Sequence, residues 1–245
     1  MIERVGSDPV DARPWEIGLI WAYELQWRPL PVIQDYQAYT PALDRLNEGA
    51  LTADDGPRYV LRHQGFDNSP AIGIDGRFTS FDVPLETLAL VCRYRPVLTS
   101  SSYQLLAKAA DRCGAPRPLG GTTAAYEEPV AVPRARPGEA IVARIDGAGP
   151  EGLELLRTLA FRAATRKIEL NIGRARLAPE NAESGLLLSL PPGADFPPPF
   201  AVAPGTSSFA ISSADGPLSS DGPLEIEFLA VPVRALQQGS TVPLD

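Results

Sequence analysis

The second half of the chain alternates apolar and polar side chains, and this period of two constrains the fold more than any other feature. Such alternation places one set of side chains on one face of a strand, whereas parallel strands buried on both faces do not show it. Short alternating segments separated by Pro- and Gly-rich turns are typical of an antiparallel β-sandwich. Strands are predicted at 129–133, 141–146, 153–161, 168–172, 185–190, 206–212 and 224–228. The side chains expected in a common core are Ile141, Ile145, Ile168, Leu170, Ile226 and Phe228.

The first half of the chain mixes short helices with short strands. Thr40 and Pro41 predict the start of a helix, because threonine caps helices and proline suits the first helical position. Leu43, Leu46 and Ala50 follow at helical spacing, and they predict its buried face.

A second helix is predicted from Pro84, since apolar residues recur after it at i, i+3, i+4 and i+7 up to Cys92. Strand candidates at 58–63 and 103–107 flank this helix. Alternation of strands and helices at this spacing is typical of a small sheet with helices packed on it.

The predicted fold class is therefore α+β, with a change of architecture near the middle of the chain. A small α/β domain is expected over residues 1–124, followed by a jelly-roll-like antiparallel β-sandwich over residues 125–245. The composition agrees, because 26 Pro and 21 Gly are too many for a helical bundle and suit short elements joined by turns.

Composition also excludes several classes of function. Thirty acidic against 22 basic side chains leave a formal charge of −8, which argues against a nucleic-acid partner. With one histidine, His63, and two cysteines, the chain cannot build a His-rich or four-cysteine metal site. The sequence has no nucleophile-elbow, phosphate-loop or metalloprotease motif. No catalytic residue, metal or cofactor is therefore predicted.

The glycines of 147–152 match the G-x-G-x-x-G pattern of dinucleotide-binding proteins. The strand before them carries Arg144 and Asp146 on one face, whereas the first strand of a dinucleotide-binding sheet is buried on both faces. We interpret the glycines as a hairpin turn. Nucleotide binding stays open as an alternative that requires a helix at 153–161.

Aromatic side chains gather near the N-terminus, where all three tryptophans lie between residues 15 and 27. Tyr36 and Tyr39 follow beside Gln34, and a loop further along supplies Asp75 and Arg77. An arginine beside carboxylates and an amide offers donors and acceptors for a hydroxyl-rich ligand. These five residues are the candidate ligand-binding site. The alternative is that they only pack the junction between an extended segment and a loop.

Cys92 and Cys113 are the two thiols of the chain, near a predicted helix end and a predicted strand end. From the residues alone they form either a disulfide or two buried thiols in a reducing compartment. No segment approaches the 18 apolar residues of a membrane span, and the first fourteen residues carry no apolar signal-peptide core.

Several short motifs resemble the soluble extracytoplasmic region of bacterial polytopic membrane proteins of uncharacterised function. They lie at 27–29, 31–41, 74–77 and 91–95 in the first half, and at 176–179 and 228–234 in the second. The resemblance implies an envelope location, membrane spans upstream of Met1, and a disulfide between Cys92 and Cys113. It carries no catalytic residue over.

The function expected from the sequence is a non-catalytic extracytoplasmic module that recognises an envelope glycan, another small ligand or a protein partner. One alternative is an enzyme domain acting on a cell-envelope glycan or lipid-linked sugar, with Asp75 or Asp82 as acid or base. Such an enzyme would show a cleft beside residues 64–82 with a carboxyl group of raised pKa. The other alternative is a cytosolic nucleotide-binding protein that uses the 147–152 glycines.

Overall fold

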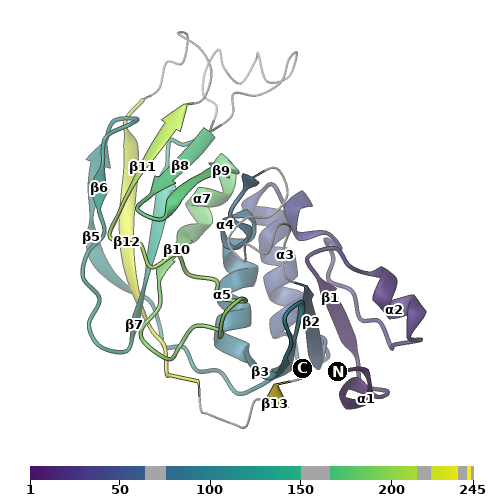
Figure 1. Cartoon of the computed structure of the whole chain (residues 1–245). Coiled ribbons are helices and arrows are strands. Elements are labelled where there is room, and N and C mark those ends of the chain that lie inside the picture. Colours follow the sequence, from purple (N-terminus) through teal and green to yellow (C-terminus); the bar gives the residue numbers. More distant parts are fainter. Residues whose placement is uncertain (64–75, 150–165, 214–221, 237–241, 244–245) are drawn as a thin grey trace, which may run out of the picture.

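The predicted α+β class is confirmed by the structure, a computed structural model that combines helices with several antiparallel sheets (Figure 1). Two four-stranded sheets lie on one side of the molecule and a five-stranded sheet on the other. The helices α3 (Pro41–Thr52) and α5 (Pro84–Arg93) lie between them (Figure 1). The structure describes residues 1–63, 76–149, 166–213, 222–236 and 242–243.

The five-stranded sheet has the strand order β1-β2-β4-β3-β13. Its β1–β2 and β3–β13 pairs are parallel, and the pairs between them are antiparallel. One face packs against side chains from the short helices α1 (Ile2–Val5) and α2 (Gly18–Ala22). The strands are β1 Val10–Arg13, β2 Tyr59–His63, β3 Tyr94–Thr99, β4 Tyr103–Lys108 and β13 Val242–Pro243.

The two four-stranded sheets are antiparallel throughout and share one hydrophobic core, which fits the predicted β-sandwich. Their strand orders are β10-β7-β12-β5 and β6-β11-β8-β9. The predicted core side chains all belong to this cluster, five of them buried and Leu170 partly buried at its margin. The strands are β5 Arg117–Ala124, β6 Val130–Ala131, β7 Glu139–Asp146, β8 Arg166–Leu170, β9 Gly173–Leu177, β10 Leu186–Ser189, β11 Ser208–Ser213 and β12 Leu224–Pro232.

A second core joins the sandwich to the helices. Ala140 and Val142 point away from the sandwich interior, so β7 is buried on both faces over this stretch. They share a cluster with Leu51 of α3, Leu90 of α5 and Val60 of β2. The helices are therefore packed between two sheets, and the pairing of β5 with β12 and of β13 with β3 links the two halves of the chain further. The division into domains 1–124 and 125–245 stays a prediction, and strand pairing crosses it in both directions.

Helix α3 begins where the sequence predicts, but it buries a different face. The Leu43 N–H donates to Thr40 Oγ1 at 3.4 Å, as expected for an N-cap. The buried side chains are Asp44, Asn47 and Leu51, whereas Leu46 is 55% exposed. The predicted apolar face is therefore wrong. The physical reason is that Asp44 accepts hydrogen bonds from two backbone N–H groups at the start of α5.

The disulfide between Cys92 and Cys113 is confirmed, with a Cα–Cα distance of 5.2 Å. It ties the end of α5 to the segment that leads into β5. Arg112 supports the same place by donating hydrogen bonds to the carbonyl oxygens of Val91, Ala194 and Arg234. Among the described residues, no helix is long and apolar enough to cross a membrane.

The remaining short elements are the 3₁₀ turn η1 (Asp35–Gln37), α4 (Thr79–Asp82), the 3₁₀ turn η4 (Pro179–Asn181) and α7 (Ala182–Gly185). Of these, η1 and α4 contribute residues to the pocket described below. The predicted strand at 153–161 lies outside the described residues, and so does the second half of the glycine motif, 150–152. The nucleotide-binding alternative requires a helix at 153–161, and this requirement is therefore untested.

Candidate functional site

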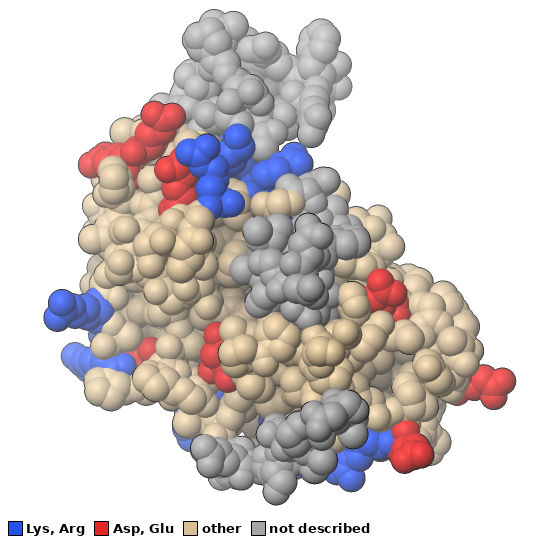
Figure 2. Space-filling model, viewed as in Figure 1, with Lys and Arg blue, Asp and Glu red and all other residues tan. Residues whose placement is uncertain are grey.

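Surface charge does not single out a binding surface on the face shown in Figure 2. Acidic and basic side chains lie beside one another there, and several are paired. The pair between Arg174 and Glu169 is an example, and so is the pair between Arg144 and Glu227 at 3.4 Å. The search for a site therefore turns to the interior.

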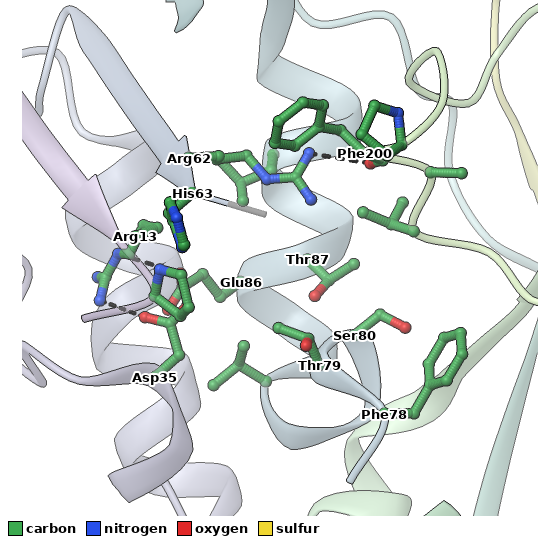
Figure 3. A pocket seen from close by; sticks show the side chains of 16 residues that line it. Arg13, Asp35, Arg62, His63, Phe78, Thr79, Ser80, Glu86, Thr87 and Phe200 are labelled. Carbon is green, nitrogen blue, oxygen red and sulfur yellow. Dashed lines mark hydrogen bonds and ion pairs between the residues drawn. The ribbon is translucent and has the colours of Figure 1, made fainter. Parts of the chain in front are cut away.

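A small enclosed pocket lined by described residues lies at the carboxyl ends of the parallel strands β1 and β2 (Figure 3). Ligands commonly bind at this end of parallel strands, because the residues that follow several strands meet there. The other walls come from α4, the start of α5 and the loop 199–202. The volume is about 50 Å³, which holds a few heavy atoms. Residues from five separate segments thus converge on one small cavity.

Arg13 ends β1 and is the centre of a buried ion cluster behind the pocket. Its Nε lies 2.9 Å from Asp11 and 3.3 Å from Glu86, and its Nη1 donates a hydrogen bond to Asp35. The same nitrogen donates to the carbonyl oxygen of Val32 at 3.1 Å. Burial alone would lower the pKa of Arg13, but the carboxylates of Asp35, Glu86 and Asp11 raise it above its ordinary value.

The three carboxyl groups around Arg13 outnumber its single positive charge. Burial raises the pKa of Asp11 and Glu86, and it raises the pKa of Asp35 well above its usual range. Arg13 opposes this shift in each case, while repulsion among the carboxylates adds to it for Asp35 and Glu86. The cluster therefore retains protons at higher pH than solvent-exposed carboxyl groups do.

Asn47 and Asp44 of α3 hold this cluster in place through hydrogen bonds. Asn47 donates to Glu86 Oε2 at 2.7 Å, and its side-chain oxygen accepts from the Val32 N–H at 2.8 Å. Asp44 accepts from the N–H groups of Leu85 and Glu86 at 2.8 and 3.0 Å. Burial raises the pKa of Asp44 to about 7. These contacts hold the start of α5, and with it Glu86, against Arg13.

Arg62 of β2 extends across the pocket toward the backbone of Phe200 (Figure 3). Its Nη1 donates to Gln104 Oε1 at 3.0 Å and to the Phe200 carbonyl oxygen at 3.2 Å. Its guanidinium lies 5.0 Å from the ring centre of Phe196 and 5.8 Å from that of Phe200. Burial lowers the pKa of Arg62 to about 10. Within the described part of the chain, Arg62 has no ion pair with any carboxylate.

Two further polar groups of the pocket lack partners. Ser80 is 4% exposed, and its Oγ is buried without a hydrogen bond to any described residue. His63 follows Arg62 and packs its ring 4.8 Å from the ring centre of Tyr103, with its Nδ1 also buried and unpaired among the described residues. Both atoms are closed off from the open space of the pocket, so they are unpaired polar groups within its wall rather than donors that face a ligand.

The structure brings four of the five predicted ligand-binding residues together. The Tyr36 hydroxyl donates to Gln34 Oε1 at 2.7 Å, and Arg77 donates to the Tyr36 carbonyl oxygen at 3.2 Å. The Arg77 guanidinium lies 5.5 Å from the Tyr39 ring centre. Asp75 lies outside the described residues.

The four residues do not line the pocket. Arg77 is 8% exposed and forms an ion pair with Asp82 at 3.3 Å, so its charge is already balanced. Their neighbours in the sequence, Asp35 and Phe78, line the pocket instead. The predicted residues therefore form a packed support next to the cavity, and their role in ligand binding stays a prediction.

Sequence reasoning missed Arg13, Asp35, Arg62 and Glu86, although one signal was available. Glu86 lies one helical turn before the apolar Leu90, beside the stripe that the apolar pattern marks as buried, and the structure buries both residues. A charged group in such a place needs a buried partner, so it points to an internal ion cluster.

Comparison with known proteins assigns neither a family nor a function to the chain. No family model, curated protein or solved structure matches the chain. The functional argument therefore rests on the geometry of the pocket.

Proposed function

We propose that this chain is a non-catalytic, extracytoplasmic recognition module of a bacterial envelope membrane protein, with the pocket beside Arg62 as its ligand site. One observation carries the proposal. Arg62 holds a positive charge in a pocket wall, and its guanidinium forms no ion pair with a described carboxylate, although Asp195, Asp35 and Glu86 attract it from beyond ion-pair distance. A half-buried guanidinium without a directly paired anion is costly, and a bound ligand of complementary chemistry would lower that cost.

The extracytoplasmic location is supported by the disulfide between Cys92 and Cys113. Disulfides persist in oxidising compartments and are rare in a reducing cytosol. The resemblance to envelope proteins agrees with this location.

An enzyme is the second candidate, because two carboxyl groups of raised pKa line a pocket beside residues 78–83, although they are not the predicted Asp75 or Asp82. They are Asp35 and Glu86, and burial, which raises the pKa of each, would favour their use as acids. Both are held against Arg13, however, and Glu86 also accepts from Asn47. Carboxyl groups engaged in this way act as structural partners, which favours the non-catalytic function.

The recognition function is tested by binding a panel of neutral saccharides, amino acids and small organic acids to the intact chain. Ala201 lines the pocket from the loop side and is partly exposed, so Ala201→Trp should fill the cavity. Ala42→Trp, on the exposed side of α3, is the matched control. We expect a panel member that binds to the wild type and to Ala42→Trp but not to Ala201→Trp. Binding that survives Ala201→Trp, or a panel without any binder, would contradict the proposal.

The enzyme alternative has a different readout. Release of product from a cell-envelope glycan or lipid-linked sugar, abolished by Asp35→Asn, would favour it over recognition alone.

A further inference from the structure

We propose that the pocket binds the carboxylate group of a small organic acid, and that the unpaired edge of the Arg62 guanidinium receives it. This inference rests on the proposed recognition function and specifies the chemical class of its ligand. It follows from the donors that Arg62 has left, from the charges around the pocket, and from the size and lining of the cavity.

The hydrogen bonds of Arg62 leave one edge of the guanidinium free. Nη1 carries two hydrogens, and Gln104 and Phe200 accept both. The remaining donors are the Nε hydrogen and two hydrogens on Nη2, which have no hydrogen-bond partner among the described residues. A guanidinium presents five N–H donors in one plane, so the Nε and Nη2 hydrogens form a fork. Such a fork matches the two oxygens of a carboxylate.

The surrounding charges limit the ligand to a single negative charge. Asp35 and Glu86 line the same pocket and, with Asp195, attract Arg62 electrostatically, but Asp35 and Glu86 are held in ion pairs with Arg13 and none of the three forms an ion pair with Arg62. A neutral ligand would leave the Arg62 fork without a charged partner in direct contact. A doubly charged phosphate would bring excess negative charge beside the carboxyl groups, which raises the electrostatic cost. A carboxylate supplies the direct contact with one negative charge.

Cavity size and lining favour a short acid with an apolar body. A volume of about 50 Å³ admits a carboxylate with a few carbons. Apolar side chains make up much of the wall. The apolar residues of the wall are Phe78, Val83, Leu90, Pro199, Phe200 and Val202.

The first test compares probes that differ in charge but not in shape. Acetate, propionate and butyrate are titrated against the intact chain by NMR or calorimetry, beside the neutral isosteres acetamide, propionamide and butyramide, and inorganic phosphate. We expect saturable binding of at least one carboxylate, with its amide at least about tenfold weaker because only the carboxylate makes charge-assisted hydrogen bonds. Phosphate should not compete. An amide that binds as well as its acid, effective competition by phosphate, or no binding of any carboxylate at millimolar concentration would overturn the inference.

The second test changes the fork while keeping the charge. Arg62→Lys retains a cation but loses the planar pair of donors, so affinity for the carboxylate should fall at least about tenfold. Arg58→Lys is the matched control, because Arg58 precedes the same strand and its side chain is 64% exposed. Unchanged affinity in Arg62→Lys would contradict the proposal.

Ala201→Trp gives an independent readout should Arg62→Lys fail to fold. Ala201 lines the pocket from a partly exposed loop, so the fold should tolerate the larger side chain while carboxylate binding is lost. Carboxylate binding that survives Ala201→Trp would then overturn this form of the site. The failure of this inference also differs from the failure of the proposed function. A neutral saccharide whose binding is lost in Ala201→Trp would leave recognition standing and overturn the carboxylate specificity.

Discussion

Arg13 and Arg62 lie opposite each other in the parallel pair of β1 and β2, but of the two only Arg13 forms ion pairs with described carboxyl groups. Arg13 is 2% exposed and contacts three carboxyl groups, whereas Arg62 has no ion pair among the described residues. Two arginines at the same level of the sheet thus have different roles. Arg13 joins β1 to α5 and to the segment around Asp35, and Arg62 leaves one edge of its guanidinium for a ligand.

This contrast predicts different costs for removing the two arginines. Arg13→Met leaves three buried carboxyl groups without their cation, and breaking a buried ion cluster in this way costs about 3–5 kcal/mol. Arg62→Met should cost less, because the loss of two hydrogen bonds is offset by removal of a poorly balanced charge. Urea unfolding followed by circular dichroism measures both. Equal costs, or a larger cost for Arg62→Met, would show that Arg13 is not the structural partner.

Asp44 should make stability depend on pH. Its pKa is raised by burial to about 7 in the folded chain, against about 4 in the unfolded chain. A carboxyl group whose pKa is raised by folding favours the folded state most below its unfolded pKa. That contribution is lost as the pH rises from about 4 to about 7. The other buried carboxyl groups act in the same direction, so a variant is needed to isolate Asp44.

Asp44→Asn keeps a side-chain oxygen that can accept from the start of α5 but does not ionise. Between pH 4 and pH 7, the free energy of unfolding of the wild type should therefore fall more than that of Asp44→Asn, by a few kcal/mol. Asp55→Asn, at a side chain that is 77% exposed, should follow the wild type. Parallel pH profiles for wild type and Asp44→Asn would show that Asp44 is not buried as a titrating group.

The disulfide should contribute to stability chiefly through the unfolded chain. Cys92 and Cys113 are 21 residues apart, and closing a loop of this length is worth about 3 kcal/mol in the chain-entropy model. Cys92→Ala combined with Cys113→Ala should lower the free energy of unfolding by about that amount. Alkylation and mass measurement without reductant verify the bond in the wild type. Two alkylated thiols in protein made under oxidising conditions would contradict the structure.

Local patterns predicted much of the fold because they depend on neighbouring residues alone. Alternation predicted the strands β7, β8 and β12 with the correct buried face, and helical spacing predicted α5 from Pro84. The same reasoning failed for α3, since its buried face carries Asp44 and Asn47 and its apolar Leu46 is exposed. An apolar pattern cannot identify a face that is buried in order to hydrogen-bond another helix.

The candidate site was less predictable, because its residues come from segments far apart in the sequence. The residues at 34–39 and Arg77 are brought together as expected, since the aromatic and polar composition of those segments suggested a contact. Arg13, Arg62 and Glu86 resemble solvated side chains when each is considered in its own segment. The packing of β1, β2 and α5 around one pocket shows their roles. Arg13 and Glu86 form an ion pair, whereas Arg62 has no ion pair with a described carboxylate.

The sandwich core offers a graded test of the alternation. Ile168 is fully buried between the two sheets, whereas Leu170 lies two residues along β8 at the margin of the same cluster. Ile168→Ala should cost about 2–5 kcal/mol, because the lost transfer free energy is joined by the cost of the cavity that remains. Leu170→Ala should cost less, since its partly exposed side chain loses less burial and the space can open to solvent. Chemical unfolding of both variants gives the comparison. A larger loss for Leu170→Ala than for Ile168→Ala would mean that the centre of the core lies nearer to the β8–β9 turn than the structure places it.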